Sequence, residues 1–214
     1  MKRMILLFVA ALTLSGLAWA QTLPAALRPA LAAHINASTD QAVIDARNAG
    51  ADNELARLYN LTASPAFPVW RTDASVDAII DSITWASYTP NDKVASTDTD
   101  PALSRKIGWL LEIQVKQMNL QLMLQGRSAI NCGKATLRAG LRDAVIQVPS
   151  GASGAATSPG GASGSTVLTT CTRPARVVEK ALAGALETTG SVSANVLVFE
   201  GAITADDVAL ALRP

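Results

Sequence analysis

Residues 64–72 read Ser64-Pro65-Ala66-Phe67-Pro68-Val69-Trp70-Arg71-Thr72 and separate two regions of helical spacing. Each proline fixes its own φ angle and keeps the preceding residue extended. The stretch is therefore predicted to be a rigid, extended strap, with Phe67 and Trp70 as hydrophobic anchors. The chain has three Phe, two Tyr and four Trp, so these two side chains are a large share of its aromatic content.

Helical spacing dominates the rest of the chain. The pattern of apolar residues predicts helices on both sides of the strap, over residues 22–35, 38–50, 52–60, 73–88, 134–148 and 174–186. A strand is predicted over residues 191–199 and a last short helix over 204–212, where Thr204 and Asp207 resemble a capping box. The predicted fold class is mainly α: a small helical domain with a central long helix, the extended strap and a minor terminal β element.

The longest predicted helix runs from Pro101 to Gln125 and is closed by Gly126. At about 1.5 Å per residue it would span roughly 40 Å. Its apolar residues form two groups that cover more than one stripe: Ile107, Leu110, Leu111, Val115, Met118 and Leu122, and then Trp109, Ile113, Leu120 and Leu124. A helix apolar on most sides is either central in its domain or partly buried by another subunit. We expect the central position, because a small domain needs no partner to explain one such helix.

A break in composition divides the chain. Residues 149–166 are rich in Gly, Ser and Ala, and Gly151-Ala152-Ser153-Gly154 recurs as Gly161-Ala162-Ser163-Gly164. Such a sequence buries too little apolar area to order itself, so the segment is predicted to be a flexible loop. It would join a helical domain at 21–148 to a helix-strand-helix unit at 167–214 that completes the same domain.

The first twenty residues have the pattern of a secretory signal peptide. Lys2 and Arg3 precede an apolar run over residues 4–17, and Ala18-Trp19-Ala20 fits a cleavage site. The alternative for residues 1–20 is a start codon placed too far upstream in a gene whose product has no leader. Cleavage would remove Lys2 and Arg3 and change the formal net charge from +1 to −1. For such a near-neutral chain we expect neither nucleic-acid binding nor a stable membrane span after cleavage.

Cys132 and Cys171 are the only cysteines. In an oxidising compartment they can form one disulfide across the Gly/Ser/Ala segment, which would stabilise the chain by roughly 3–4 kcal/mol. In a reducing compartment both would be small buried hydrophobic residues. The sequence leaves these two alternatives open. Two cysteines and a single histidine cannot form the usual four-ligand zinc site.

The sequence contains no recognisable catalytic constellation. It has no G-x-S-x-G nucleophile motif, no P-loop and no G-x-G-x-x-G motif after a strand. The single histidine, His34, has no partner nearby in sequence and is interpreted as an ordinary surface residue. Two charged rows, typical of solvated helix faces, occur at Asp73, Asp77 and Asp81 and at Lys134, Arg138 and Arg142. No catalytic residue, cofactor or metal ligand is therefore predicted.

Two neighbouring segments carry a family resemblance. The run Glu54-Leu55-Ala56-Arg57-Leu58-Tyr59-Asn60 and the strap after it resemble an uncharacterised family of tailed-phage and prophage proteins, whose members carry Ser-Pro-x-x-x-Val-Trp-Arg-Thr. Thr172-Arg173-Pro174-Ala175-Arg176 and Phe199-Glu200-Gly201 are similar to later elements of that family. The resemblance covers residues 22–212 and includes no known active site. The leader at residues 1–20 departs from the family, whose members begin near the first helix.

The resemblance implies a function by genetic context, because such genes lie among virion structure and assembly genes. The expected function is that of a non-enzymatic phage or prophage virion structural or morphogenesis protein. Its partners would be other virion or assembly proteins, or further copies of itself. Phe67, Trp70, Arg71 and Trp85 are the expected interface or structural anchors, since aromatic and Arg side chains are favoured at contact hot spots. Burial of Trp70 in the core is an equally acceptable interpretation.

The alternative function is that of a secreted periplasmic helical protein that binds a partner or the cell envelope. The two hypotheses differ in location. The protein would act in the virion or host cell if residues 1–20 are not a leader, and in the periplasm or outside the cell if they are cleaved.

Overall fold

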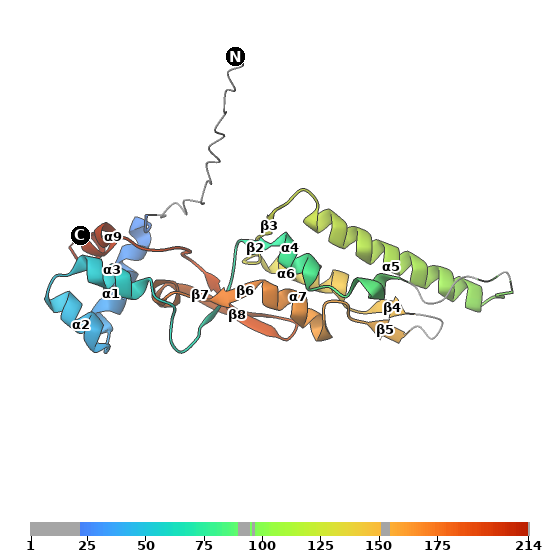
Figure 1. Ribbon diagram of the computed structural model, residues 1–214, viewed down its shortest axis with the longest axis horizontal. Helices are drawn as coiled ribbons and strands as arrows, with labels where there is room; N and C mark the ends of the chain where they lie inside the picture. The colour runs from blue at the N-terminus through green and yellow to red at the C-terminus, as the bar shows by residue number, and fades with distance from the viewer. Residues whose placement is uncertain (1–21, 90–94, 96, 151–154, 214) are drawn as a thin grey trace, which may run out of the picture.

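The protein is a mixed α/β molecule of elongated shape (Figure 1). The computed structural model describes residues 22–89, 95, 97–150 and 155–213, so the predicted leader lies outside the described residues. The prediction of a mainly α fold is wrong, because one four-stranded and two two-stranded sheets accompany the helices in these ranges. No helix in the same ranges has the length and apolar character that crossing a bilayer requires.

The helices and strands alternate irregularly along the chain. The N-terminal part is helical and contains η1 (Ala25–Leu27), α1 (Arg28–Ala37), α2 (Gln41–Asn48) and α3 (Asp52–Tyr59). The middle part contains β1 (Pro68–Trp70), β2 (Ala74–Ser75), α4 (Val76–Asp81), η2 (Trp85–Tyr88), α5 (Ala102–Leu124), β3 (Ala129–Ile130), α6 (Ala135–Val145) and β4 (Val148–Ser150). The C-terminal part contains β5 (Ala155–Thr157), η3 (Ala162–Gly164), α7 (Ser165–Thr170), β6 (Thr172–Pro174), α8 (Val177–Ala181), β7 (Ala183–Thr189), β8 (Val192–Leu197) and α9 (Ala205–Leu212).

The predicted strap is extended, and it forms an inner strand of the four-stranded sheet, which is ordered β6-β1-β8-β7. β1 pairs antiparallel with β6, where Val69 lies opposite Arg173. It pairs parallel with β8, where Trp70 lies opposite Val196. β-branched and aromatic side chains suit a pleated strand, and proline is tolerated as its first residue. The strap is therefore held on both sides by segments from the C-terminal part of the chain.

The helix predicted over residues 174–186 ends early, and this is a main source of the error in fold class. α8 stops at Ala181, and the chain enters β7, which pairs antiparallel with β8. The two-residue turn between these strands begins at Gly190, whose φ of 60° lies in the left-handed region that glycine adopts without strain. The Ala and Leu residues of this segment favour a helix locally, but pairing with the Val-rich β8 outweighs that preference.

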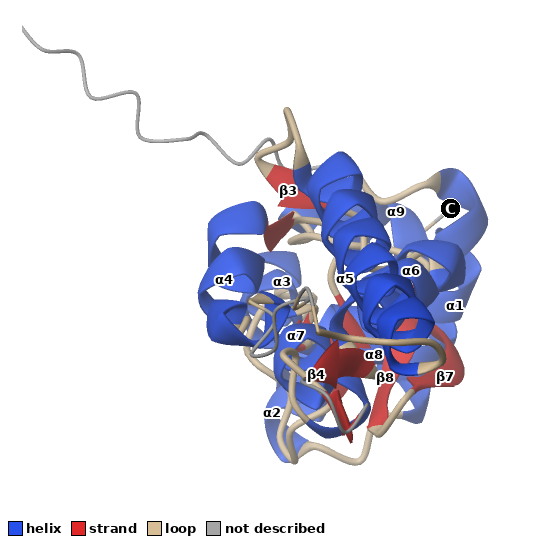
Figure 2. Cartoon of the chain, turned by 90° about the vertical axis from the view of Figure 1, so that its right-hand side faces the viewer, coloured by secondary structure: helices blue, strands red, loops and turns tan. Residues whose placement is uncertain are grey.

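Two hydrophobic clusters lie along the molecule. One joins α1, α2 and α3 to α8 and α9, so both ends of the described chain meet at one end of the molecule (Figure 1). The other surrounds the fully buried Trp70 and draws on α4, α5, α6 and α7. Figure 2 views the molecule from the end that carries α5 and shows α5 beside α6, in front of the four-stranded sheet.

The segment predicted as a flexible loop, 149–166, contains regular structure. β4 and β5 pair antiparallel, and η3 and α7 follow, while residues 151–154 lie outside the described residues. Gly160 permits close packing in this segment. Gly160 is buried, and a Cβ atom at this position would collide with the side chain of Val145 at the end of α6.

Cys132 and Cys171 form a disulfide, with their Cα atoms 5.6 Å apart. Both residues are fully buried. The backbone of Arg71, directly after β1, lies between them: its N–H donates to the Cys171 carbonyl and its carbonyl accepts from the Cys132 N–H, each at 3.0 Å. The bridge therefore joins the segments on either side of the residue at which the chain leaves the inner strand.

The long helix α5 covers the predicted residues but has a different position in the fold from the central one that was predicted. It runs along the outer edge of the molecule, with α6 and the β4–β5 hairpin on one side of it (Figure 1). Ile113, Leu120 and Leu124 are buried on its inner face. The prediction of a central helix is wrong, because much of the first apolar group faces away from the core of the single chain.

Candidate contact surface

Trp70, expected as an anchor, is a core residue. Its ring is fully buried, and its indole N–H donates to the Glu187 carbonyl at 3.3 Å. The guanidinium of Arg138 lies over the ring, 4.5 Å from its centroid. Trp70 therefore stabilises the fold and offers no surface to a partner.

Arg138 is buried, although the sequence placed it in a solvated basic row. Its guanidinium donates to the Cys132 carbonyl at 2.6 Å and to the Thr189 hydroxyl at 3.1 Å, and it forms an ion pair with Glu187. These contacts connect α6 to β7 and to the disulfide. Arg138 is consequently a structural residue and not part of a solvated face.

Phe67 and Arg71 also have structural roles. Phe67 is half-buried, with the Lys180 ammonium 5.8 Å from its ring centroid. The Arg71 side chain donates to Asp73 at 2.8 Å, which holds the pKa of that carboxyl below its usual range. Of the four expected anchors, Trp85 is the one that projects a large aromatic surface into solvent, at 42% exposure.

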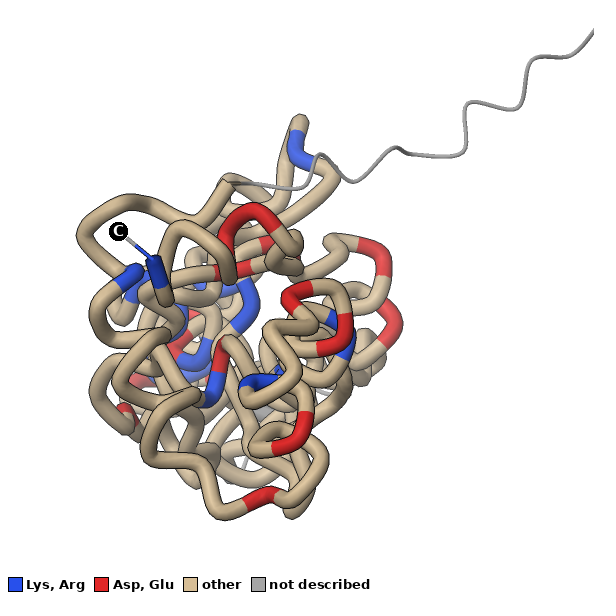
Figure 3. Tube along the Cα trace, turned by 90° about the vertical axis from the view of Figure 1, so that its left-hand side faces the viewer, with Lys and Arg blue, Asp and Glu red and all other residues tan. Residues whose placement is uncertain are grey.

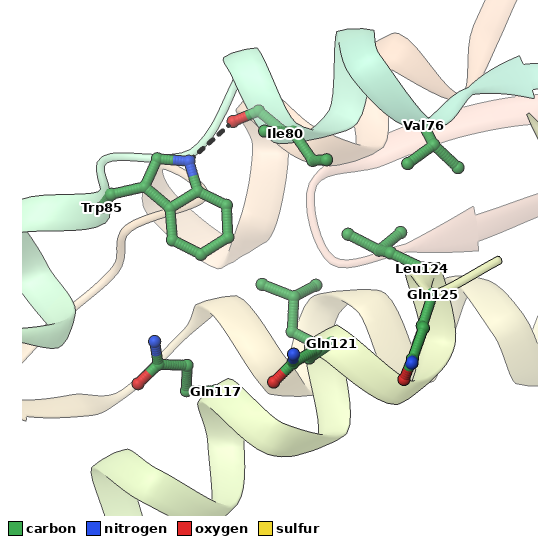
Figure 4. A pocket seen from close by; sticks show the side chains of 8 residues that line it. Val76, Ile80, Trp85, Gln117, Gln121, Leu124 and Gln125 are labelled. Atoms are coloured by element: carbon green, nitrogen blue, oxygen red, sulfur yellow. Dashed lines mark hydrogen bonds between the residues drawn. The ribbon is translucent and has the colours of Figure 1, made fainter. Parts of the chain in front are cut away.

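Trp85 forms one wall of a groove between α4 and α5, with a volume of about 410 Å³ (Figure 4). Its indole N–H donates to the Ile80 carbonyl at 3.0 Å, which fixes the ring across the groove. The rest of the lining consists of apolar residues and a row of glutamines one helical turn apart: Val76, Ile80, Leu120 and Leu124, and Gln117, Gln121 and Gln125. The groove thus has an apolar floor and an uncharged polar rim.

The row of exposed apolar side chains on the outer face of α5 is the most extended apolar surface feature of this helix. We call it the α5 ridge; it consists of Ile107, Leu111, Val115, Met118 and Leu122, which are 45% to 63% exposed. At 100° per residue these positions fall within an arc of about 80°. They therefore form one straight row along the helix, directly opposite side chains that anchor α5 in the core.

A second groove, of about 630 Å³, follows the other side of the ridge, between α5 and α6. Val115 and Leu122 belong both to the ridge and to the lining of this groove, and Leu137 and Gly140 supply its α6 wall. The outer face of α5 is thus an apolar ridge with a groove on each side. This shape matches the way in which helices pack, with the ridge of one in the groove of another.

His34 lies in a separate cleft of about 440 Å³. Its Nδ1 and the Tyr59 hydroxyl are 2.8 Å apart. Burial, together with the charge of Lys180, lowers the pKa of His34, and burial raises the pKa of Tyr59 to about 12. At neutral pH both groups are therefore uncharged hydrogen-bonding partners, as in a structural contact between α1 and α3.

Charges of both signs are intermingled at the helical end of the molecule (Figure 3). Asp73 is engaged with Arg71, and Asp77 and Asp81 are exposed along α4. Among the described residues, no three His, Cys, Asp or Glu side chains are grouped so that they could hold a metal ion. The described surface thus offers apolar contact more clearly than it offers ion binding.

No family model, curated protein or solved structure matches this chain.

Proposed function

We propose that this chain is an exported, non-enzymatic protein that works by protein–protein contact through the α5 ridge. The observation that carries the proposal is the ridge itself, in which five large apolar side chains remain about half exposed on a helix anchored in the core. Single exposed apolar residues are common on soluble proteins, whereas a contiguous row is typical of an interaction site.

Two further observations support export as the setting. The first twenty residues have the pattern of a secretory leader, and the two cysteines form a disulfide. Disulfides persist in oxidising compartments and are rare in the cytosol. These observations favour the secreted alternative over a role inside the host cell.

A contact role in a virion is the second candidate function, and the strap motif supports it. Because Trp70 is buried, the strap motif supports a fold shared with the phage family and does not indicate a shared interface. Both functions would use exposed surface rather than a reactive centre, and they differ in compartment.

A photo-crosslinking experiment tests the contact role. The photoreactive amino acid p-benzoylphenylalanine is placed at Leu111 in the ridge or, as a matched control, at Leu186, an exposed leucine of β7. Both variants are irradiated in the cells that produce the chain. We expect protein adducts from position 111 well above those from position 186. Equal or absent adducts would overturn the proposed role of the ridge.

Mass spectrometry of the same purified chain tests the compartment. An N-terminus at Gln21 together with oxidised Cys132 and Cys171 is expected. A chain that starts near Thr22 from an internal start codon and has free thiols, or sedimentation of the chain with virions, would instead support the assembly function.

A further inference from the structure

We propose that a second copy of this chain occupies the α5 ridge, with the two α5 helices packed antiparallel about a two-fold axis beside Val115. The inference rests on the proposed contact role of α5 and names the partner. Three features of the ridge support it: the order of its residues, the residues that flank it, and its area.

The spacing of the ridge residues is nearly the same in both directions along the helix. From Ile107 the steps are four, four, three and four residues, and from Leu122 they are four, three, four and four. When two copies are aligned antiparallel about a point between residues 114 and 115, Ile107 lies level with Leu122 of the other copy. Leu111 then lies level with Met118, and Val115 lies next to the axis. An isologous interface requires a surface that can pair with a second copy of itself, and a row with nearly the same spacing in both directions meets this requirement.

The flanking residues are compatible with this alignment. No charged residue interrupts the ridge, so no charge is buried on pairing. Glu112 comes within about 3 Å of level with Asn119 of the second copy, by the helical rise. A carboxylate then faces an amide donor, and the two helix dipoles are opposed.

Each copy has both the ridge and a groove that can receive the ridge of the other copy. The ridge of one copy can enter the groove between α5 and α6 of the other, since Val115 and Leu122 form part of both. The groove volume of about 630 Å³ leaves room for several large side chains. This is the ridge-in-groove geometry of paired helices, repeated twice by the symmetry.

The available area sets the expected strength. Five side chains at 45% to 63% exposure, with their polar neighbours, offer on the order of 500 Å² per copy. About 1,000 Å² over both copies is the lower limit for a specific interface. We therefore expect a dimer with a dissociation constant in the micromolar range.

Sedimentation equilibrium of the mature, oxidised chain tests the pairing. The wild-type chain is expected to be in monomer–dimer equilibrium. Leu122→Lys is expected to weaken the dimer by roughly 100-fold, because it places an ammonium group in each of two symmetry-related apolar contacts. Leu186→Lys is the matched control, since Leu186 is as exposed as Leu122 at 63% but lies on β7. Circular dichroism checks that both variants fold.

Loss of dimer in the ridge variant alone supports the proposal. A monomeric wild-type chain at hundreds of micromolar, or equal dimerisation of all three chains, overturns it. The crosslinking experiment separates this failure from that of the proposed function. If position 111 forms adducts only with a different protein, the ridge is a contact site but its occupant is not a second copy.

Single cysteines in the ridge test the orientation. Leu111→Cys and Met118→Cys are made separately, and the two chains are mixed under mild oxidation. Antiparallel pairing predicts mainly the mixed 111–118 disulfide. Residue 111 of one chain lies level with residue 118 of the other, but about 10 Å along the axis from residue 111 of the other. Predominant 111–111 and 118–118 disulfides would indicate parallel helices and overturn the proposed alignment.

Discussion

Glu179 shows how a single buried carboxylate can join distant parts of the chain. It is fully buried at the start of α8 and accepts two hydrogen bonds from Arg173, both at 2.7 Å. It also accepts from the backbone N–H groups of Arg176 at 2.8 Å and Gly201 at 3.1 Å. Burial alone would raise the pKa of Glu179, but these donors outweigh it and hold the pKa below its ordinary value. The charge therefore ties β6, α8 and the segment before α9 together.

Replacing this carboxylate should be costly. Glu179→Gln is expected to lower the free energy of unfolding by about 3 kcal/mol at neutral pH, because Arg173 loses a buried ionic partner. Urea denaturation followed by circular dichroism measures the change. Asp81→Asn, an exposed residue of α4, is the control and should change stability by less than about 0.5 kcal/mol.

The same variant has a defined pH signature. Because folding lowers the pKa of Glu179, its contribution is fully present above the ordinary pKa of 4.5 and is lost as pH falls through the folded value. Stability of the wild-type chain should therefore decline below about pH 4.5 more steeply than that of Glu179→Gln. Parallel pH profiles for the two chains would contradict this role.

At the scale of elements, two glycines differ in whether the surrounding structure has space for a side chain. Gly160 is buried between α6 and α7, and a Cβ atom there would overlap Val145 and approach Val167 to 3.0 Å. Gly108 lies inside α5, and a Cβ atom there would have no neighbour within 4 Å. The first glycine allows two elements to pack closely, whereas the second only weakens its helix.

Alanine substitution should separate these two cases. Gly160→Ala is expected to destabilise the chain by about 2 kcal/mol through overpacking. Gly108→Ala should stabilise it by about 0.5–1 kcal/mol, since alanine restricts the unfolded chain and favours the helix. Thermal unfolding of both variants against wild type provides the measurement. A stabilising Gly160→Ala would show that the segment after β5 is not packed as described.

Local patterns in the sequence were sufficient to predict the elements that are stabilised by residues close to them in sequence. The described helices include one at or within every predicted helical segment, and Thr204 and Asp207 form the predicted capping box. Elements that depend on distant partners were not predictable in this way. β7 begins with Ala and Leu residues that favour a helix, and it becomes a strand through its pairing with β8. The burial of Arg138 depends on Trp70 and Glu187, which are remote in sequence.

The sequence showed that α5 carries the apolar residues of the ridge, but it did not show that they lie on the solvent-facing side of the helix. Leu110 was grouped with the ridge residues, and spacing alone could not show which apolar face meets the core. That choice is made by the elements that pack against α5, which are α6, β4 and η2, and it buries Ile113, Leu120 and Leu124. The fold leaves the other apolar group in solvent, and this placement gave the candidate contact surface.

At the scale of the whole molecule, the disulfide joins parts of the chain that lie 39 residues apart in sequence. Its loss should lower the free energy of unfolding by about 3–4 kcal/mol, by the entropy of closing a loop of that length. Urea unfolding of the wild-type chain and of the double variant Cys132→Ala/Cys171→Ala measures the difference. Equal stability of the two chains would contradict this estimate.

The two cysteines have a consequence for how the protein matures. A chain with two thiols has one possible intramolecular bridge, whereas four thiols already allow three arrangements. Oxidation of this chain cannot trap a scrambled isomer. A cell that exports it therefore needs an oxidant to close the bridge, but no isomerase to correct it.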